Sequence, residues 1–341
     1  MVIEIEARNL TSLFNDFVGN NKVMFNFKTD GKMVDVQVLD DYTACTSFEC
    51  NSLDNDFAVV DISVWITKFI KVLNHKEPIR FTITDAALFI EQSTFYCTLL
   101  REYEARRELP DSSAFTAKEV QVGRLKYLVH ATQGATPLAK ELALSEPDPM
   151  FVNDRYYVDY KQTFFIDSFD FPAHCIPFST LKNFAYKLKD GATYCDLPDL
   201  NAVYFHTGKY EFWVPTTDYN INASLISAID KKYAECTAVT KVKFVEYKDR
   251  LIVLSSAFPK TKMVFAVGPE AFNIGVDTNT AHMLVGYQLT KALLSFNVTS
   301  AQLDVIVKMF GDEDNVEILR GASCICLRSR TKILLISVMI Y

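Results

Sequence analysis

The sequence predicts an α+β fold made from one repeated unit, in which an amphipathic helix is followed by short antiparallel strands. Apolar residues at helical spacing alternate along the chain with apolar residues at every second position. The predicted helices lie about 45–60 residues apart, and they centre near Leu13, Lys68, Tyr127, Phe184, Ala228 and Leu289. Each unit is too small to cover both faces of its own strands, so units must pair. Six units predict three similar domains, with all helices on one face of a continuous sheet.

Length and composition agree with several globular cores. The chain has 341 residues, of which 49% are hydrophobic and 23% are charged, with 11 glycines and 11 prolines. This composition excludes a disordered chain, and the length suits two or three domains. Residues 108–117 contain a Pro-Asp-Ser-Ser stretch that is typical of a linker. We therefore expect domains at residues 1–115, 116–217 and 218–341.

Targeting signals and cysteine spacing indicate a cytoplasmic protein. The most apolar stretch, residues 333–340, is too short to cross a bilayer, and the first residues lack the basic region of a signal peptide. The eight cysteines include no C-x-x-C pair. This spacing favours reduced, mostly buried thiols over a zinc site. We expect no membrane partner and no metal.

The first two units show the repeated pattern most clearly. The first helix carries an apolar stripe at i, i+3, i+4 and i+7, made of Leu10, Leu13, Phe14 and Phe17. The second helix is expected to bury Trp65, Phe69, Ile70 and Leu73. Alternating residues predict strands at 23–27, 34–38, 79–83, 88–90 and 95–99.

The remaining four units repeat the pattern with more variation. Helices are expected around Leu125–Val129, Leu181–Leu188, Leu225–Ile229 and Leu289–Phe296. Strands are expected at residues 156–160, 164–166, 203–205, 210–214, 242–244, 251–253, 263–267, 303–307, 316–318, 324–326 and 333–335.

Positive charge gathers on the predicted helices, although the net charge of the chain is −7. Lysine on one exposed helix is ordinarily a solvated face. Because five of the six predicted helices share this feature, it favours a surface that attracts a phosphate backbone without reading base sequence. The candidate DNA-facing residues are Lys68, Lys71, Arg124, Lys126, Lys182, Lys187, Lys189, Lys231, Lys232 and Lys291.

Several short motifs support a family resemblance. Residues 176–181 read Ile-Pro-Phe-Ser-Thr-Leu, residues 188–191 read Leu-Lys-Asp-Gly, and residues 201–205 read Asn-Ala-Val-Tyr-Phe. Together with the repeated units, they resemble the bacterial-type DNA sliding clamps, the β subunits of DNA polymerase III. Asp218 and Tyr219 match the family's Phe-Pro-Asp-Tyr turn, with Thr217 in place of proline. A remote member, for instance from a virus, is expected to look like this.

The resemblance implies the DNA-clamp fold and a polymerase processivity factor. In that family two chains form a head-to-tail homodimeric ring, whose helices line a central hole around double-stranded DNA. Such a ring tethers a DNA polymerase and is served by a clamp loader. The closed ring is then held on DNA by topology and not by affinity. The lysine contacts with phosphate are screened by salt and stay weak enough for the ring to slide.

The resemblance also implies two protein-binding surfaces. A client-peptide pocket is expected at Tyr219, Ile221, Val338, Met339, Ile340 and Tyr341. The tail lacks the family's Met-Pro-Met-Arg-like ending, and residues 160–165 lack its Asp-Gly-His-Arg-like segment; the tail reads equally well as a buried final strand. The ring interface is expected to pair an edge strand with the partner chain, through Phe95, Cys97, Leu99 and Tyr233.

Catalytic motifs are sparse, so we predict no enzyme and no cofactor. None of the five histidines lies in an H-E-x-x-H or H-x-H pattern, and P-loop, Rossmann and G-x-S-x-G motifs are missing from the sequence. Glu102 and Glu104 could pair as carboxylates, but alternation on a strand next to a linker explains them more simply. Two alternatives remain: a clamp-fold adaptor in transcription or replication that does not encircle DNA, and a hydrolase or transferase with an unrecognised site.

Overall fold

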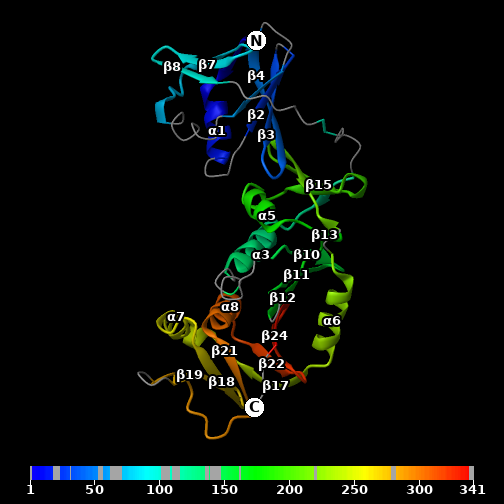
Figure 1. Ribbon diagram of the computed structural model, residues 1–341, viewed down its shortest axis with the longest axis vertical. Helices are drawn as coiled ribbons and strands as arrows, with labels where there is room; N and C mark the ends of the chain where they lie inside the picture. Colours follow the sequence, from blue (N-terminus) through cyan, green and yellow to red (C-terminus); the bar gives the residue numbers. More distant parts are fainter. Residues whose placement is uncertain are drawn as a thin grey trace. The chain divides into compact units, whose positions relative to one another are not determined.

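The computed structural model describes residues 2–17, 24–30, 32–52, 57–61, 71–100, 108–109, 116–134, 138, 147–160, 163–218, 221–277 and 282–337. These residues belong to two compact units (Figure 1). The first unit comprises Met1–Val122 and Ser179–Thr216, and the second comprises Gly123–Phe178 and Thr217–Tyr341. The division of the chain at residues 115 and 217 stays a prediction.

The first unit is built on a twelve-stranded antiparallel sheet. Its main path runs β8-β7-β6-β1-β4-β16-β15-β14-β9, and β3 continues from β4 to β2 and β5. The strands are β1 (Val2–Glu6), β2 (Met24–Thr29), β3 (Met33–Leu39), β4 (Thr43–Ser52), β5 (Phe57–Asp61), β6 (Pro78–Ile83), β7 (Ala87–Gln92), β8 (Phe95–Leu100), β9 (Lys118–Glu119), β14 (Thr193–Leu197), β15 (Ala202–Thr207) and β16 (Tyr210–Pro215).

Helices α1 and α5, which the structure describes in full, accompany this sheet, and both were expected. Helix α1 (Ala7–Phe17) buries Leu10, Leu13 and Phe17, which confirms the predicted apolar stripe. Helix α5 (Phe178–Ala185) buries Leu181 and Phe184 and begins in the second unit with Phe178. The second predicted helix lies largely outside the described residues, as does Lys68; residues 71 and 72 are helical.

The second unit contains two antiparallel sheets. The eight-stranded sheet has the order β13-β10-β11-β12-β24-β23-β22-β17, and the four-stranded sheet has the order β20-β19-β18-β21. Their strands are β10 (Met150–Val152), β11 (Arg155–Asp159), β12 (Thr163–Ser168), β13 (His174–Cys175), β17 (Thr237–Val242), β18 (Lys262–Gly268), β19 (Ala271–Asp277), β20 (His282–Gly286), β21 (Leu294–Thr299), β22 (Val316–Arg320), β23 (Cys324–Ser329) and β24 (Lys332–Ser337).

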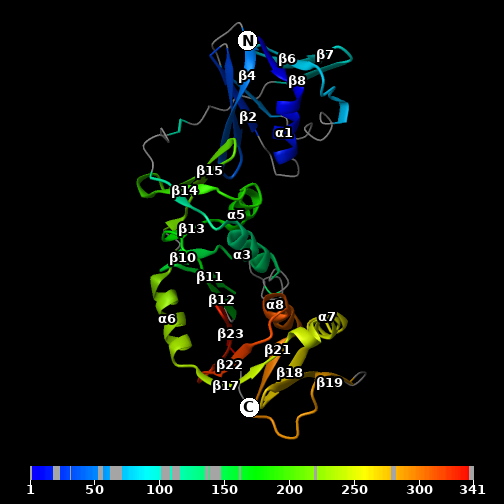
Figure 2. The same cartoon turned by 180° about the vertical axis from the view of Figure 1, so that it is seen from behind.

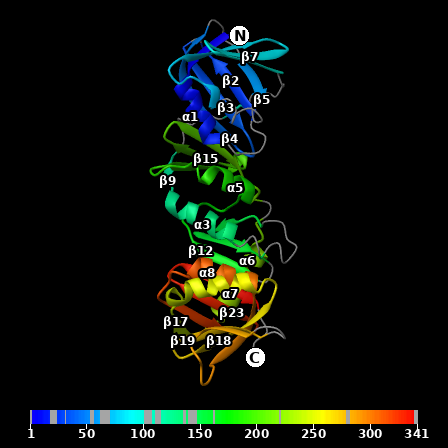
Figure 3. The same ribbon diagram turned by 90° about the vertical axis from the view of Figure 1, so that its left-hand side faces the viewer.

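The helices that the structure describes in full on these sheets are α3 (Val122–Gly134), α6 (Ala223–Ala234), α7 (Lys248–Ala257) and α8 (Ser300–Phe310). Helix α7 lies against α8 (Figure 3). Short 3-10 turns, η2 (Pro198–Leu200) and η4 (Val245–Tyr247), complete the helical segments that are described. No described helix is long and apolar enough to cross a membrane.

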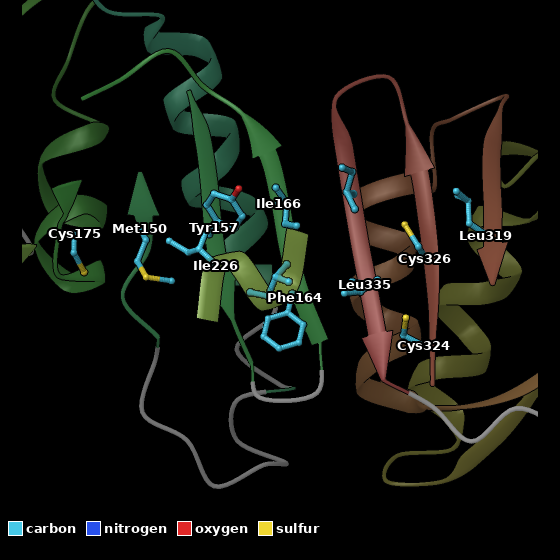
Figure 4. Close-up of a cluster of buried hydrophobic side chains, with 12 residues drawn as sticks. Met150, Tyr157, Phe164, Ile166, Cys175, Ile226, Leu319, Cys324, Cys326 and Leu335 are labelled. Carbon is cyan, nitrogen blue, oxygen red and sulfur yellow. The ribbon is translucent and has the colours of Figure 1, made fainter. Parts of the chain in front are cut away.

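The eight-stranded sheet is covered by helices on both of its faces. Alternate residues of β12 show this: Thr163 accepts a hydrogen bond from Gln302 of α8, at 3.2 Å, whereas Phe164 belongs to a core cluster with Ile226 and Ile229 of α6. Figure 2 shows α6 separated from α3 and α8 by the strands, and Figure 4 shows the cluster. The expectation that all helices share one face is therefore wrong for α6.

Three predicted elements near the C-terminal end are wrong. Residues 287–293 link β20 to β21 without a helix, and the expected stripe ends in Leu294 and Phe296, which alternate as buried residues of β21. Residues 251–253 and 303–307, predicted as strands, lie in α7 and α8. Helix α8 is buried nearly all round, and a short continuous apolar run does not distinguish a buried helix from a buried strand.

Candidate nucleic-acid interface

In the first unit, aromatic contacts place α1 and α5 on the same face of the sheet. The Phe17 ring of α1 lies 5.8 Å from the Tyr210 ring, and the Phe184 ring of α5 lies 6.3 Å from Tyr42. Tyr42 and Tyr210 both contact Phe212 of β16, at 5.8 and 6.0 Å. The basic residues of α5 and those around α1 therefore belong to one side of this unit.

Lys187, one of the candidate DNA-facing residues, makes an internal contact. Its Nζ donates a hydrogen bond to the carbonyl oxygen of Asp16 and lies 4.6 Å from the centre of the Phe17 ring. Burial lowers the pKa of Lys187, against the opposing effect of Asp16. Because the last carbonyls of a helix have no partner within it and attract cations, this lysine stabilises the end of α1.

Lys209 was not among the candidates and joins the same contact. Its Nζ lies 2.8 Å from Ser12 Oγ and 5.3 Å from the centre of the Phe48 ring. The neighbouring Tyr210 hydroxyl donates to the Asp16 carboxylate. The sequence offered no signal for this cluster, since Lys209 lies in the turn between β15 and β16.

The other candidates of the first unit have more accessible side chains. Lys71 and Lys189 are exposed, and Lys182 of α5 is half-buried. Lys189 lies just beyond α5, where its backbone N–H donates to Thr207 Oγ1 at 2.9 Å. These three lysines stay candidates for contact with a phosphate backbone.

Arg124 of α3 is a structural residue. Its guanidinium donates to the Asp167 carboxylate and to Thr331 Oγ1, at 2.6 Å for the latter, and lies 5.6 Å from the centre of the Tyr127 ring. Burial raises the pKa of Asp167, although Thr331 and Arg124 favour the ionised form. The contact ties the start of α3 to the ends of β12 and β24. Lys126, two residues on, is half-buried.

The cations of α7 and α8 are mostly paired with nearby carboxylates. Lys248 Nζ lies 2.6 Å from Asp312 Oδ1, and Lys308 Nζ lies 2.7 Å from Asp304 Oδ2. Arg250 is exposed on α7. Sequence reasoning missed Arg250 because it placed a strand here.

Three further candidates lie elsewhere than expected. Lys231 and Lys232 are exposed on α6, which covers the opposite face of the eight-stranded sheet from α3 and α8. Lys291 is exposed in the link between β20 and β21, not on a helix. Lys231 and Lys232 cannot share one surface with α3, because the sheet lies between α6 and α3.

The expected client-peptide pocket is described at one residue, Ile221. Ile221 is half-buried and packs against the cluster beneath α6. The preceding Asp218 accepts from the Cys175 backbone N–H at 3.0 Å and lies 2.9 Å from His174 Nδ1. The aspartate therefore fixes the turn that positions Ile221. Tyr219 and the tail Val338, Met339, Ile340 and Tyr341 lie outside the described residues.

The expected ring-interface residues fall into two groups. Phe95, Cys97 and Leu99 lie on β8, which ends the described order of the twelve-stranded sheet. Tyr233 instead packs on the cluster beneath α6, and its hydroxyl accepts from Arg328 Nη1 at 2.9 Å. Tyr233 is half-buried within its own unit, and its part in a ring interface stays a prediction.

A second free edge, which the sequence did not indicate, lies in the second unit. Strand β20 ends the described order of the four-stranded sheet, and its Leu284 is exposed. Helix α7 contacts β20 and exposes Ile252 and Val253. Among the described residues β20 pairs on one side alone, and such an edge beside exposed apolar side chains is a surface suited to another polypeptide chain.

Two pockets in the described chain show no catalytic arrangement. One, of about 480 Å³, is lined mainly by charged side chains. Two of these, Glu317 and Arg328, pair with each other at 2.9 Å. A second pocket of about 370 Å³ lies beside Tyr247 and Tyr287. Among the residues that the structure describes, no group of three or more His, Cys, Asp or Glu could hold a metal ion.

Comparison with solved structures identifies the fold across the whole chain. A putative DNA polymerase III β subunit from Eubacterium rectale superimposes with a TM-score of 0.76 at 9% identity, covering 99% of each chain. The sliding clamp of Bacillus subtilis gives 0.73 at 13% identity, again over 99% of each. The Helicobacter pylori β clamp bound to a DNA ligase peptide gives 0.71 at 12% identity, covering 99% of this chain and 100% of that one.

The chain has the fold of the bacterial sliding clamps. This confirms the predicted fold class and the resemblance seen in the sequence motifs. No protein-family model and no curated protein sequence matches the chain. At 9–14% identity to the clamps, the likeness lies in the clamp architecture and not in shared residues.

Proposed function

We propose that this protein is a DNA sliding clamp, a non-enzymatic processivity factor that encircles duplex DNA as a homodimeric ring. The observation that carries the proposal is the clamp fold over 99% of the chain, with matching coverage of the solved clamps. The match also covers 99% of each of those two clamps, so the similarity extends over the length of a clamp protomer. Its clients would be a DNA polymerase and a clamp loader.

The ring interface is proposed to join β8 of one protomer to β20 of its partner. Each strand has a described neighbour on one side alone, and each edge carries exposed apolar side chains, Tyr96 on β8 and Leu284 on β20. Ile252 and Val253 of α7 would cover the joint. Closing both edges in this way removes two sites of non-specific strand pairing.

The DNA-facing set is proposed to be Lys71, Lys126, Lys182, Lys189 and Arg250. These residues lie on or beside the helices α3, α5 and α7 and the described end of the second predicted helix. Lys187 and Arg124 are left out because each makes an internal contact. Contact with DNA would be electrostatic and independent of base sequence.

The deciding experiment is retention on circular DNA. Purified protein is loaded on nicked circular duplex, with a clamp loader if required, and followed by gel filtration before and after the circle is linearised. A clamp stays with the circle and leaves the linear molecule, because its binding is topological. Equal retention on both forms would contradict encirclement.

The interface can be tested separately with Leu284→Asp and Ile252→Asp in one chain. Both side chains are exposed in the protomer, so we expect folded monomers, measured by analytical ultracentrifugation. Val264→Asp is a matched control, because Val264 is similarly exposed but lies on β18, an interior strand that pairs with β19 and β21. Dimers that survive the double change would rule out this joint.

The DNA-facing surface is tested by reversing charge at Lys182 and Lys189. The variant Lys182→Glu/Lys189→Glu is expected to reduce processive synthesis. The control Lys231→Glu/Lys232→Glu makes the same change in charge on α6, on the face of the eight-stranded sheet opposite α3 and α8, and is expected to leave synthesis unchanged. Equal effects of the two variants would refute the assignment of this surface.

One observation favours a second candidate, an adaptor of clamp fold that does not encircle DNA. The cations on α7 and α8 are largely neutralised by Asp312 and Asp304, and Arg124 is neutralised by Asp167. An adaptor needs no basic inner surface. Retention on neither circular nor linear DNA, together with capture of a replication or transcription protein, would select this candidate.

A further inference from the structure

Two cysteines meet at the end of helix α6. Cys236 Sγ lies 3.8 Å from Cys324 Sγ, although 88 positions separate them in the chain. Cys236 lies two residues beyond the end of α6 and is half-buried, while Cys324 begins β23 and is 2% exposed. A disulfide bond is about 2 Å long, so side-chain shifts of less than about 2 Å in total would join the two sulfurs.

The backbone brings the pair together through a glycine. Thr237 pairs with Arg320 across β17 and β22, which sets Cys236 opposite Gly321. The Gly321 N–H donates to the Cys324 carbonyl at 2.8 Å and so closes the turn between β22 and β23. A Cβ at position 321 would lie 2.6 Å from Cys324 Sγ and 3.1 Å from Cys236 Sγ. The space that holds the two sulfurs therefore depends on glycine.

We propose that Cys236 and Cys324 form an oxidisable dithiol, whose disulfide ties the end of α6 to β23. With a small-molecule disulfide as oxidant, the Cys236 thiolate attacks one oxidant sulfur and displaces a thiolate. The Cys324 thiolate then attacks Cys236 Sγ and displaces the second. Two S–H bonds are lost, one S–S bond forms, and the oxidant takes up two electrons and two protons as two thiols.

The environment of the pair determines which thiol reacts first and under which conditions. Cys236 is the accessible member, so it meets the oxidant, and the buried Cys324 resolves the mixed disulfide. Burial, reinforced by the adjacent Cys324, raises the pKa of Cys236. The dithiol therefore resists oxidation near neutral pH and reacts faster in mildly alkaline solution.

The disulfide would hold the end of α6, a helix with few buried polar contacts among the described residues. Near its end, α6 is linked to the sheet by the hydrogen bond from Arg328 to Tyr233 and by the packing of Cys236. A covalent bond here closes a long loop of chain and reduces the freedom of the unfolded state. The disulfide would form within one protomer, and its formation does not depend on DNA encirclement.

The test treats the full chain with oxidised glutathione at mildly alkaline pH, blocks free thiols by alkylation, and maps linkages by mass spectrometry without reduction. We expect a peptide pair that joins Cys236 to Cys324 and is lost on reduction. The midpoint of thermal unfolding should rise by about 5–10 °C in the oxidised protein. A Cys236–Cys326 linkage, a linkage between chains, or unlinked Cys236 in the folded oxidised protein would overturn the proposal.

Two pairs of variants sharpen the test. Cys324→Ser should leave a glutathione adduct on Cys236, whereas Cys326→Ser should keep the 236–324 linkage, because Cys326 is a fully buried neighbour on the same strand. Gly321→Ala should slow the linkage several-fold. Gly123→Ala is its control, because nothing lies within 4 Å of a Cβ there. Linkage at an unchanged rate in folded Gly321→Ala protein would refute the geometry.

Discussion

The two faces of the eight-stranded sheet are joined to their helices by different kinds of contact. On the α3 and α8 face, buried polar groups meet: Asp167 is 0% exposed and pairs with Arg124, and Gln302 bonds to Thr163. On the α6 face, Ile226 and Ile229 pack on an apolar cluster.

The polar contacts of α6 lie nearer solvent, as at Asp230, which is 39% exposed and bonds to Tyr157 at 3.2 Å. Buried hydrogen bonds fix one arrangement, because any shift leaves a polar group unpaired. Apolar packing tolerates small displacements. Helices α3 and α8 are therefore fixed in register, whereas α6 is held mainly by the burial of apolar side chains.

The largest expected effect comes from removing the buried carboxylate. Asp167→Ala should lower the free energy of unfolding by about 3–4 kcal/mol, because the Arg124 guanidinium loses its partner in a partly buried position. Urea denaturation measures the change. Asp304→Ala, which breaks the exposed pair with Lys308, should cost less than about 1 kcal/mol. Equal losses of stability in the two variants would mean that the buried pair on the polar face stabilises the fold no more than an exposed ion pair does.

A smaller effect is expected on the apolar face. Ile229→Ala should cost about 2–3 kcal/mol, at the low end for a buried isoleucine, because α6 can settle into part of the space. Ser227→Ala, on the exposed side of the same helix, should be neutral within about 0.5 kcal/mol. A loss for Ile229→Ala above that of Asp167→Ala would reverse the ranking of the two faces.

The cap of α8 should contribute less again. The Thr299 side chain accepts from the Gln302 backbone N–H at 3.2 Å, and the Gln302 side chain accepts in return from the Thr299 N–H at 2.9 Å. Thr299→Ala is expected to cost about 1 kcal/mol in urea denaturation. Thr299→Ser retains the hydroxyl and should restore most of the loss; a serine variant as unstable as the alanine one would exclude the cap as the cause.

The smallest effect is a difference in pH dependence between the faces. The folded-state pKa of Asp167 lies above its ordinary value of 3.8, chiefly through burial. Its contribution to stability is therefore present below that value and is lost as pH rises through the folded pKa. On the α6 face, hydrogen bonding from Arg328 lowers the pKa of Glu317 below 4.5, so its contribution is lost as pH falls.

Denaturation midpoints measured across the acid range should show both signs. Asp167→Asn removes a contribution to stability that weakens as pH rises. Glu317→Gln removes a contribution that weakens as pH falls. Parallel pH profiles for the two variants would contradict the opposite shifts.

Much of the fold was predictable from sequence because its signals are local. The stripe of Leu10, Leu13 and Phe17 determines α1, and period-two alternation located most of the strands that the structure describes. Helix α8 also has a local signal, the Thr299-x-x-Gln302 capping box, but its nearly continuous apolar sequence concealed the helical period.

The candidate site was less predictable, because tertiary contacts decide which of its charged side chains are paired inside the protein and which face solvent. Arg124 and Thr331 are 207 positions apart, and Lys187 and Asp16 are 171 apart. No local pattern distinguishes a lysine that caps a distant helix from one that meets solvent. The sequence of α6 likewise shows which side of the helix is apolar. It does not show which face of β12 and β23 that side covers.

The pairing of β4 with β16 has a consequence for how the protein is made. Thr43, Ala44 and Cys45 take Trp213, Phe212 and Glu211 as their neighbours, so the first unit needs chain from both ends of a long interval. On a ribosome that synthesises the protein from its N-terminus, this edge of β4 waits unpaired until residue 213 has emerged. Strand pairings of such sequence separation form slowly, and unpaired edges attract other chains. The nascent protein is therefore most prone to aggregation, and most dependent on chaperones, while the intervening segment is being made.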